Sequence, residues 1–159
     1  MAKNKHVPEH VELEHQVILN APINRVFRLF TPLEEKKWER DWEPKFLYPK
    51  SGKIKEDSLF ITEDDGQTTI WMVKIYTTYK HHIAYHRITP DIVAGTVDIK
   101  CRPYGEQTSA TIKYSFTTLS KDGEAFLQRW TPSYYKSYIE DWRKKINHFL
   151  KTGEQLQEE

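Results

Sequence analysis

The first regular pattern in the chain is an alternation of apolar and polar residues between residues 11 and 19. In VELEHQVIL, one face carries Val11, Leu13, His15, Val17 and Leu19, and the other carries two glutamates and a glutamine. Because successive side chains of a strand point to opposite faces, this alternation predicts a half-buried strand.

Two short helices are predicted after this strand. At Asn20-Ala21-Pro22 the strand pattern stops, where Asn can cap a helix and Pro can begin one. The segment INRVFRLF (23–30) then has apolar residues at helical spacing. Thr31-Pro32-Leu33-Glu34 has the form of a capping box, which predicts a second short helix ending near Trp38.

Between residues 45 and about 119 the sequence consists of β-branched and aromatic runs. Turn signals such as SGK, DDG, TPD and YGE separate these runs. The pattern predicts an antiparallel meander of five or six strands, which with the first strand makes a sheet of about six to seven.

The segment from residue 122 to 152 returns to helical spacing. Pro132 predicts a kink or restart within it, and Gly153 predicts its end. The order of strand, two short helices, meander and long helix predicts an α+β fold, with the C-terminal helix packed on a curved antiparallel sheet. The expected apolar stripe of this helix is Leu127, Trp130, Tyr134, Tyr138, Trp142, Ile146 and Phe149 or Leu150.

These segments, in this order, resemble the START-like superfamily of polyketide cyclases and lipid-transfer proteins (SRPBCC, the helix-grip fold). The resemblance is carried by VILNAPINRVFRLFTPLEEKKW, by TIWMVKIYTTYKHHIAYHR with a following Pro, by GEQTSATIKYSFTTL and by YYKSYIEDWRKKINHFLKTG. It implies a cavity between the sheet and the long helix that takes a hydrophobic or amphipathic small molecule. The superfamily has no universal catalytic motif, so the resemblance assigns no catalytic residue.

Length and composition limit the alternatives. The 159 residues suit one domain spanning residues 1–159, with residues 1–8 and 153–159 as flexible ends. Lys plus Arg number 24 and Asp plus Glu number 23, a balance that gives no basis for nucleic-acid binding. The sequence shows no signal peptide and no run long enough for membrane insertion, which predicts a cytoplasmic protein.

The histidine-rich stretch KHHIAYHR (80–87) raises the possibility of a metal site, because His82 and His86 have the spacing that helical zinc sites use. The surrounding Thr, Ile, Val and Tyr favour a strand, on which the two histidines are about 13 Å apart. Zinc ligands lie about 2 Å from the metal, so we expect no metal site here, and no cofactor. The more apolar row, Ile83, Tyr85 and Arg87, is predicted to face the cavity.

The same phase argument predicts the residues that line the cavity. An inward Arg87 needs a partner, which the sequence leaves open as a protein carboxylate, a ligand anion or water. His15 is either a hydrogen-bonded histidine of the core or a polar group of the cavity. Cys101, the single cysteine, is predicted to be an inert buried thiol. The predicted ligand-binding residues are Trp71, Tyr85, Arg87, Tyr114, Tyr134 and Tyr138, with His15 as a further candidate.

Three functions are consistent with these residues. The first is binding of a hydrophobic or aromatic small molecule in the cavity. The second is a cyclase, dehydratase or hydrolase that uses the same cavity, with His15, Tyr85 or Arg87 acting on a carbonyl or a proton. The third is a surface-acting interaction protein like the chaperone-ATPase activators, with Trp38 and Trp42 as a contact patch or a lid. The sequence contains no nucleophile with its base and no carboxylate pair, so it favours binding over catalysis.

Overall fold

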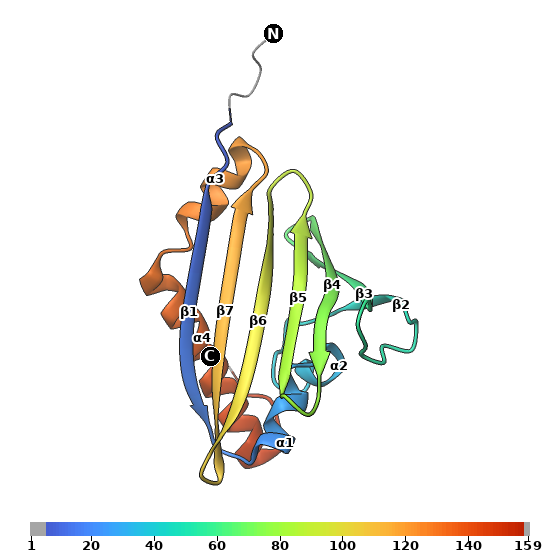
Figure 1. Cartoon of the computed structure of the whole chain (residues 1–159), viewed down its shortest axis with the longest axis vertical. Coiled ribbons are helices and arrows are strands. Elements are labelled where there is room, and N and C mark those ends of the chain that lie inside the picture. The colour runs from blue at the N-terminus through green and yellow to red at the C-terminus, as the bar shows by residue number, and fades with distance from the viewer. Residues whose placement is uncertain (1–5, 158–159) are drawn as a thin grey trace.

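The computed structural model describes residues 6–157, and its main element is an antiparallel sheet. The sheet has seven strands in the order β1-β7-β6-β5-β4-β3-β2, so that the first strand pairs with the last (Figure 1). The strands are β1 (His10–Leu19), β2 (Lys45–Tyr48), β3 (Leu59–Asp64), β4 (Gln67–Thr77), β5 (His82–Thr89), β6 (Val93–Tyr104) and β7 (Gln107–Thr118).

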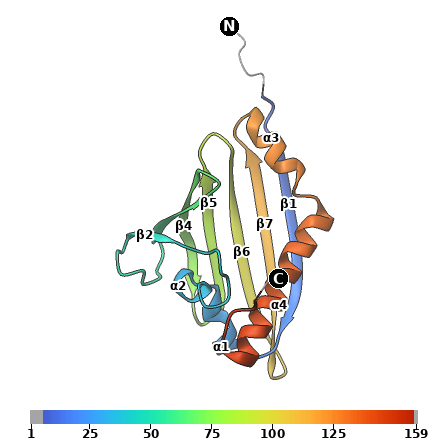
Figure 2. The same cartoon turned by 180° about the vertical axis from the view of Figure 1, so that it is seen from behind.

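Helices cover one face of this sheet. The longest helix lies across that face, along β1 and β7, and the short helices that follow β1 lie near the opposite end of the molecule from α3 (Figure 2). The prediction of an α+β helix-grip fold is therefore confirmed. The helices are α1 (Ile23–Phe27), the 3-10 turn η1 (Arg28–Phe30), α2 (Pro32–Glu35), α3 (Lys121–Gln128) and α4 (Pro132–Thr152).

The predicted faces of the strands are also those observed. In β1, Leu13 and Val17 are buried while Glu14 and Gln16 between them are exposed. In β5, Ile83 and Tyr85 are buried on the inner face, and His86 is exposed on the outer one. Neighbouring inner rows are in register, because Tyr85 pairs with Val73 of β4 and with Val97 of β6.

The C-terminal segment is two helices rather than one, and its buried stripe differs in part from the predicted one. α3 ends at Gln128, and α4 begins at Pro132 with Thr131 as its N-cap, whose hydroxyl accepts a hydrogen bond from the Tyr134 N–H at 3.1 Å. Trp142, Ile146 and Leu150 of the predicted stripe are buried, as expected. Its members in α4 are four residues apart, a spacing that drifts about 40° around a helix at each step, so Tyr134 in the first turn lies away from the sheet. Tyr134 is consequently 46% exposed, and the prediction that it faces inward is wrong. The buried residues of α4 are Tyr135, Ile139, Trp142, Ile146 and Leu150.

The start of the α1–α2 segment also differs in detail from the prediction. Pro22, not Asn20, occupies the N-cap position of α1. Thr31 is the N-cap residue of α2, but its hydroxyl donates to the Arg28 carbonyl at 2.7 Å and caps nothing. The capping-box prediction is therefore wrong, although the helix that it predicted exists.

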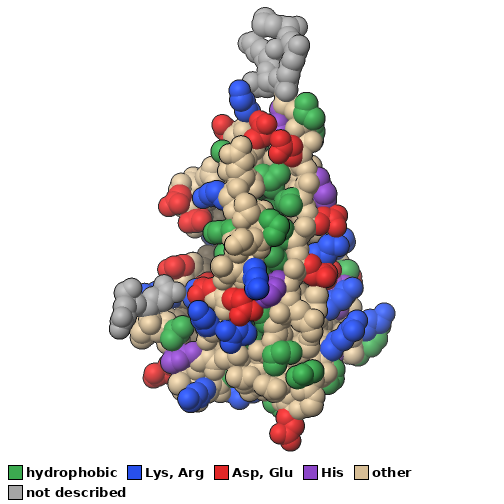
Figure 3. Space-filling view, turned by 90° about the vertical axis from the view of Figure 1, so that its left-hand side faces the viewer, with side chains coloured by type: hydrophobic (Ala, Val, Ile, Leu, Met, Phe, Trp, Pro, Cys, Tyr) green, Lys and Arg blue, Asp and Glu red, His purple; other side chains and the backbone are tan. Residues whose placement is uncertain are grey.

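An aromatic cluster joins the helices to the sheet. The Trp142 ring lies 5.7 Å from Trp38, 6.2 Å from Phe30 and 6.2 Å from Tyr114, measured between ring centroids. On the side where α4 meets β1, hydrophobic side chains reach the surface between charged ones (Figure 3). No helix within residues 6–157 is both long and apolar enough to cross a membrane.

The predicted flexible ends lie partly outside the described residues, namely at 1–5 and 158–159. Within the described part, the His6 ring lies 2.9 Å from the Thr118 hydroxyl, and Gln155 donates to the Lys36 carbonyl at 2.9 Å. The flexibility of both ends stays a prediction.

Candidate functional site

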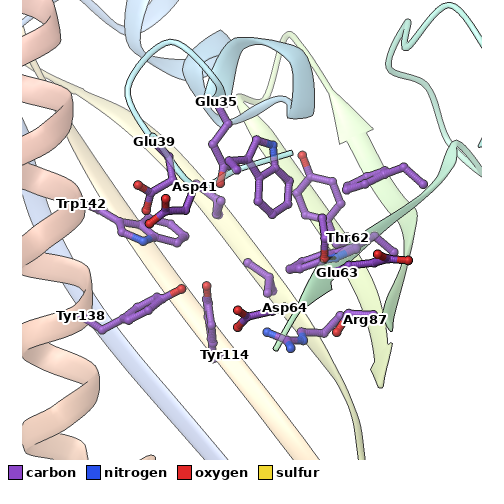
Figure 4. A pocket seen from close by; sticks show the side chains of 17 residues that line it. Glu35, Glu39, Asp41, Thr62, Glu63, Asp64, Arg87, Tyr114, Tyr138 and Trp142 are labelled. Carbon is purple, nitrogen blue, oxygen red and sulfur yellow. Dashed lines mark hydrogen bonds between the residues drawn. The ribbon is translucent and has the colours of Figure 1, made fainter. Parts of the chain in front are cut away.

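A pocket of about 330 Å³ lies between the inner face of the sheet, helix α4 and residues 36–44, which we call the strap (Figure 4). Its lining residues come from α2, the strap, strands β3 to β7 and α4. They are Glu35, Glu39, Asp41, Trp42, Phe60, Thr62, Glu63, Asp64, Thr69, Trp71, Tyr85, Arg87, Val97, Ile99, Tyr114, Tyr138 and Trp142.

Aromatic rings form one wall of the pocket. Phe60 and Trp71 are stacked at 5.8 Å, and Trp42 of the strap meets Trp71 edge to face at 5.5 Å. The indole N–H of Trp71 donates to Thr62 at 2.9 Å, and that of Trp42 donates to the Pro32 carbonyl at 2.9 Å. With their polar atoms already paired, these rings offer apolar faces to a ligand.

Arg87 places a positive charge in this wall. Its guanidinium carbon lies 5.0 Å from the Trp71 ring centre and 5.2 Å from that of Phe116. Its Nε is buried and has no hydrogen-bond partner within residues 6–157, and no carboxylate there forms an ion pair with it. Burial lowers the pKa of Arg87, but a guanidinium remains charged in proteins. The side chain therefore keeps unmet hydrogen-bonding capacity at the pocket surface.

Two tyrosine hydroxyls point into the pocket, those of Tyr114 and Tyr138 (Figure 4). Burial raises the pKa of both, so both stay protonated at neutral pH. Tyr85 differs, because its hydroxyl donates to the Phe30 carbonyl at 2.8 Å and holds η1 against the sheet.

The other end of the pocket is acidic. Glu39 of the strap forms an ion pair with Lys145 of α4, at 2.9 and 3.1 Å. Glu35 forms no hydrogen bond through its carboxyl group in the part of the chain that the structure describes. Burial, and then the charge of Glu39, raise the pKa of Glu35 well above its ordinary value. Glu35 could not be predicted from the sequence, because a four-residue helix carries no periodicity that could assign its face.

Five of the seven predicted site residues line the pocket, namely Trp71, Tyr85, Arg87, Tyr114 and Tyr138. The other two lie elsewhere. Tyr134 packs on the Trp130 ring at 5.1 Å on the outer side of α4. His15 lies 2.8 Å from the Glu140 carboxylate, a contact that joins β1 to α4.

The remaining candidates of the sequence analysis are structural. Trp38 is 1% exposed and donates to the Leu29 carbonyl at 2.8 Å, so the proposed surface patch of Trp38 and Trp42 is wrong. His82 pairs with Asp98 at 2.9 Å on the outer face. Burial raises the pKa of the Cys101 thiol to about 12. Residues 6–157 contain no group of three or more His, Cys, Asp or Glu that could hold a metal ion.

Solved structures similar to this chain share its fold. Norcoclaurine synthase from Thalictrum flavum matches with a TM-score of 0.66 and 8% identity over 96% of this chain and 97% of its own. A protein of the dynemicin biosynthetic locus, DynU16, matches with a TM-score of 0.62 and 16% identity over 90% of this chain, which spans about half (48%) of that protein. An uncharacterised protein from Rhizobium leguminosarum matches with a TM-score of 0.63 and 18% identity over 91% of this chain and 97% of its own.

These likenesses establish the helix-grip fold and nothing more specific. The norcoclaurine synthase has also been solved in complex with dopamine and hydroxybenzaldehyde. No protein-family model and no curated protein sequence matches this chain.

Proposed function

We propose that this helix-grip protein binds a small aromatic molecule carrying one anionic group or polarised carbonyl, in the pocket between the sheet and α4. A volume of about 330 Å³ is near the lower end of the range for small-molecule sites and suits one or two fused rings. The stacked Phe60 and Trp71 and the edge of Trp42 supply the apolar contacts.

The observation that carries this proposal is the unpartnered Arg87. A buried polar atom without a partner costs free energy, and a ligand oxygen that accepts from the guanidinium removes that cost. The guanidinium is flanked by Trp71 and Phe116, so a ligand ring can lie along the same aromatic wall.

The charges around the pocket limit the ligand further. Asp41, Glu63 and Asp64 are exposed members of its lining, so the entrance is negatively charged. Such an entrance repels multiply charged anions, because like charges at short range disfavour association. A monoanion or a neutral carbonyl compound is therefore favoured. The synthase that shares the fold binds small aromatic molecules, one of them an aldehyde, which is consistent with this class.

The test is a comparison of wild type with Arg87→Met, using 2-naphthoate as the probe and tryptophan fluorescence as the readout. Loss of a charge-assisted hydrogen bond of about 2 kcal/mol weakens binding about 30-fold. The matched control is Arg102→Met, which removes an exposed arginine from the outer row of β6 and leaves the affinity unchanged.

Two results would contradict the proposal. Equal affinity of wild type and Arg87→Met would remove Arg87 from the site. An Arg87→Met protein that unfolds at much lower urea, before any change in affinity can be measured, would make the arginine structural. Native mass spectrometry of freshly purified protein, followed by extraction, identifies any ligand that co-purifies.

A further inference from the structure

We propose that the same pocket is an active site for proton transfer, in which Glu35 is the acid–base group and the hydroxyls of Tyr114 and Tyr138 stabilise the oxyanion formed on the substrate. This inference rests on the binding proposed above and adds a reaction to it. The substrate class is a small aromatic molecule with a carbonyl group and an acidic C–H bond beside it.

The position of Glu35 is the first argument. It is the last residue of α2, and its side chain extends from that helix into the pocket, toward the side where Tyr138 and Tyr114 point their hydroxyls (Figure 4). Its charge also raises the pKa of Tyr85, Tyr114 and Tyr138, so Glu35 lies within electrostatic reach of three residues on three different elements.

The second argument is that the Glu35 carboxyl is not used by the fold. Glu39, one helical turn later, has two bonds to Lys145, and Glu34 pairs with Lys37 on the surface. For Glu35 the described residues provide neither a hydrogen bond nor an ion pair. A half-buried carboxyl that makes no structural contact in a pocket is available to a substrate.

The charges that face Glu35 favour its protonated form. The strap contributes Glu39 and Asp41, and the sheet and α4 contribute tyrosines that stay neutral. Two cations lie on elements that border the pocket. Arg87 lies at the other end of it (Figure 4), and Lys145 forms ion pairs with Glu39 and Asp141. A carboxyl with a raised pKa can both accept a proton from carbon and return it near neutral pH, which is where acid–base catalysis is most effective.

The reaction needs no co-reactant. The Glu35 carboxylate removes a proton from the carbon beside the carbonyl, the electron pair of the C–H bond forms a C=C bond, and the carbonyl π pair moves to the oxygen. The Tyr114 and Tyr138 hydroxyls donate to this enolate oxygen. When the substrate also carries a C=C bond conjugated with the enolate, return of the proton from Glu35 to the far carbon of that bond completes an isomerisation. One C–H bond breaks, one forms, and no atom is oxidised or reduced overall.

The test uses 5-nitrobenzisoxazole, a flat aromatic probe that a general base opens. The base takes the proton on the ring carbon, the N–O bond breaks, and the coloured 2-cyano-4-nitrophenolate forms with its negative charge on oxygen. We expect wild type to accelerate this reaction over the same concentration of acetate. Its kcat/KM should rise with pH with a midpoint above the ordinary glutamate value of 4.5.

Two variants of α2 test whether Glu35 is the base that opens the probe. Glu35→Gln keeps the shape of the side chain and removes the base, so kcat/KM should fall about 100-fold, within the range for acid–base groups. Glu34→Gln is the matched control, because Glu34 is the neighbouring residue of α2 and lies outside the pocket lining; its rate should stay that of wild type. Circular dichroism and urea unfolding establish that both variants are folded.

The outcomes separate the two proposals. A probe that quenches tryptophan fluorescence, and therefore binds, but is opened equally by wild type and Glu35→Gln overturns proton transfer and leaves binding intact. A midpoint at the ordinary glutamate pKa also overturns it, since the reacting base is then not the buried one. A probe that does not bind at millimolar concentration overturns both proposals, because each requires the pocket to admit flat aromatic molecules.

Discussion

At the scale of single residues, the pocket contains two ionisable groups whose surroundings oppose their charged forms. Burial lowers the pKa of Arg87 and raises that of Glu35. The guanidinium nevertheless stays charged and lacks a full set of partners, whereas the carboxyl binds a proton more readily than an ordinary glutamate does. The ordinary pKa of a guanidinium lies so far above neutral pH that burial does not remove its charge. The ordinary pKa of a carboxyl is close enough to neutral pH for burial to change its protonation.

The raised pKa of Glu35 has a consequence for stability. A carboxyl whose pKa is higher in the folded than in the unfolded chain binds more protons in the folded state between those two values. Stability conferred on the folded protein by protonated Glu35 is therefore fully present below pH 4.5 and is lost as pH rises toward the folded pKa.

We therefore predict that Glu35→Gln is more stable than wild type at pH 8, and that the difference disappears near pH 4. Glutamine has the neutral form at every pH and does not lose this stability. The measurement is urea unfolding at several pH values, with Glu34→Gln as the control. A difference that is independent of pH, or that grows toward low pH, would show that Glu35 is solvated.

At the scale of elements, close approach of two strands shapes the pocket floor. Gly95 of β6 is in register with Arg87 of β5 on one side and Phe116 of β7 on the other. A Cβ on Gly95 would lie 1.8 Å from the backbone oxygen of Ser115, which a side-chain movement cannot relieve. Glycine is thus required here so that β6 and β7 can approach beneath the Arg87–Phe116 contact.

Gly95→Ala should accordingly destabilise the protein by about 1–3 kcal/mol or more, the range for overpacking in a closely packed interior. Lys100→Ala, at an exposed position of the same strand, should change the free energy of unfolding by less than about 0.5 kcal/mol. Urea unfolding of both variants measures these two changes in the free energy of unfolding. A Gly95→Ala protein as stable as wild type would mean that β6 and β7 separate at no cost.

At the scale of the whole molecule, Trp142 connects the layers that enclose the pocket. It contacts Trp38 of the strap, Phe30 of η1 and Tyr114 of the sheet, and it lines the pocket itself. Removing it takes away the packing of α4 against both the sheet and the short helices.

We predict that Trp142→Ala lowers the free energy of unfolding by about 3–5 kcal/mol, as for other large buried aromatics. Tyr134→Ala on the same helix is the control, and because Tyr134 is 46% exposed its loss should cost less than about 1 kcal/mol. The free energy of unfolding of both variants is measured by chemical denaturation. The opposite order of the two losses would place the buried stripe of α4 on the Tyr134 side.

Much of this architecture was predictable because strand and helix periods are local properties. Alternation in β1 and β5 placed Leu13 and Val17 inside, and it placed Ile83, Tyr85 and Arg87 in one row facing the helix. Four residues of the pocket, Trp71, Tyr85, Arg87 and Tyr114, could be named for the same reason, since a strand's phase fixes its inner face once the buried side is known. Tyr138 followed from helical spacing.

What the tertiary structure alone decided depends on contacts between distant segments. α2 is too short to have a phase, so only its packing against the sheet reveals that Glu35 enters the pocket. In the first turn of α4, only the packing of the helix on the sheet reveals that Tyr135 is buried and Tyr134 is exposed. Whether Arg87 has a hydrogen-bond partner depends on how three strands and the strap pack around it, and no local sequence pattern predicts that packing.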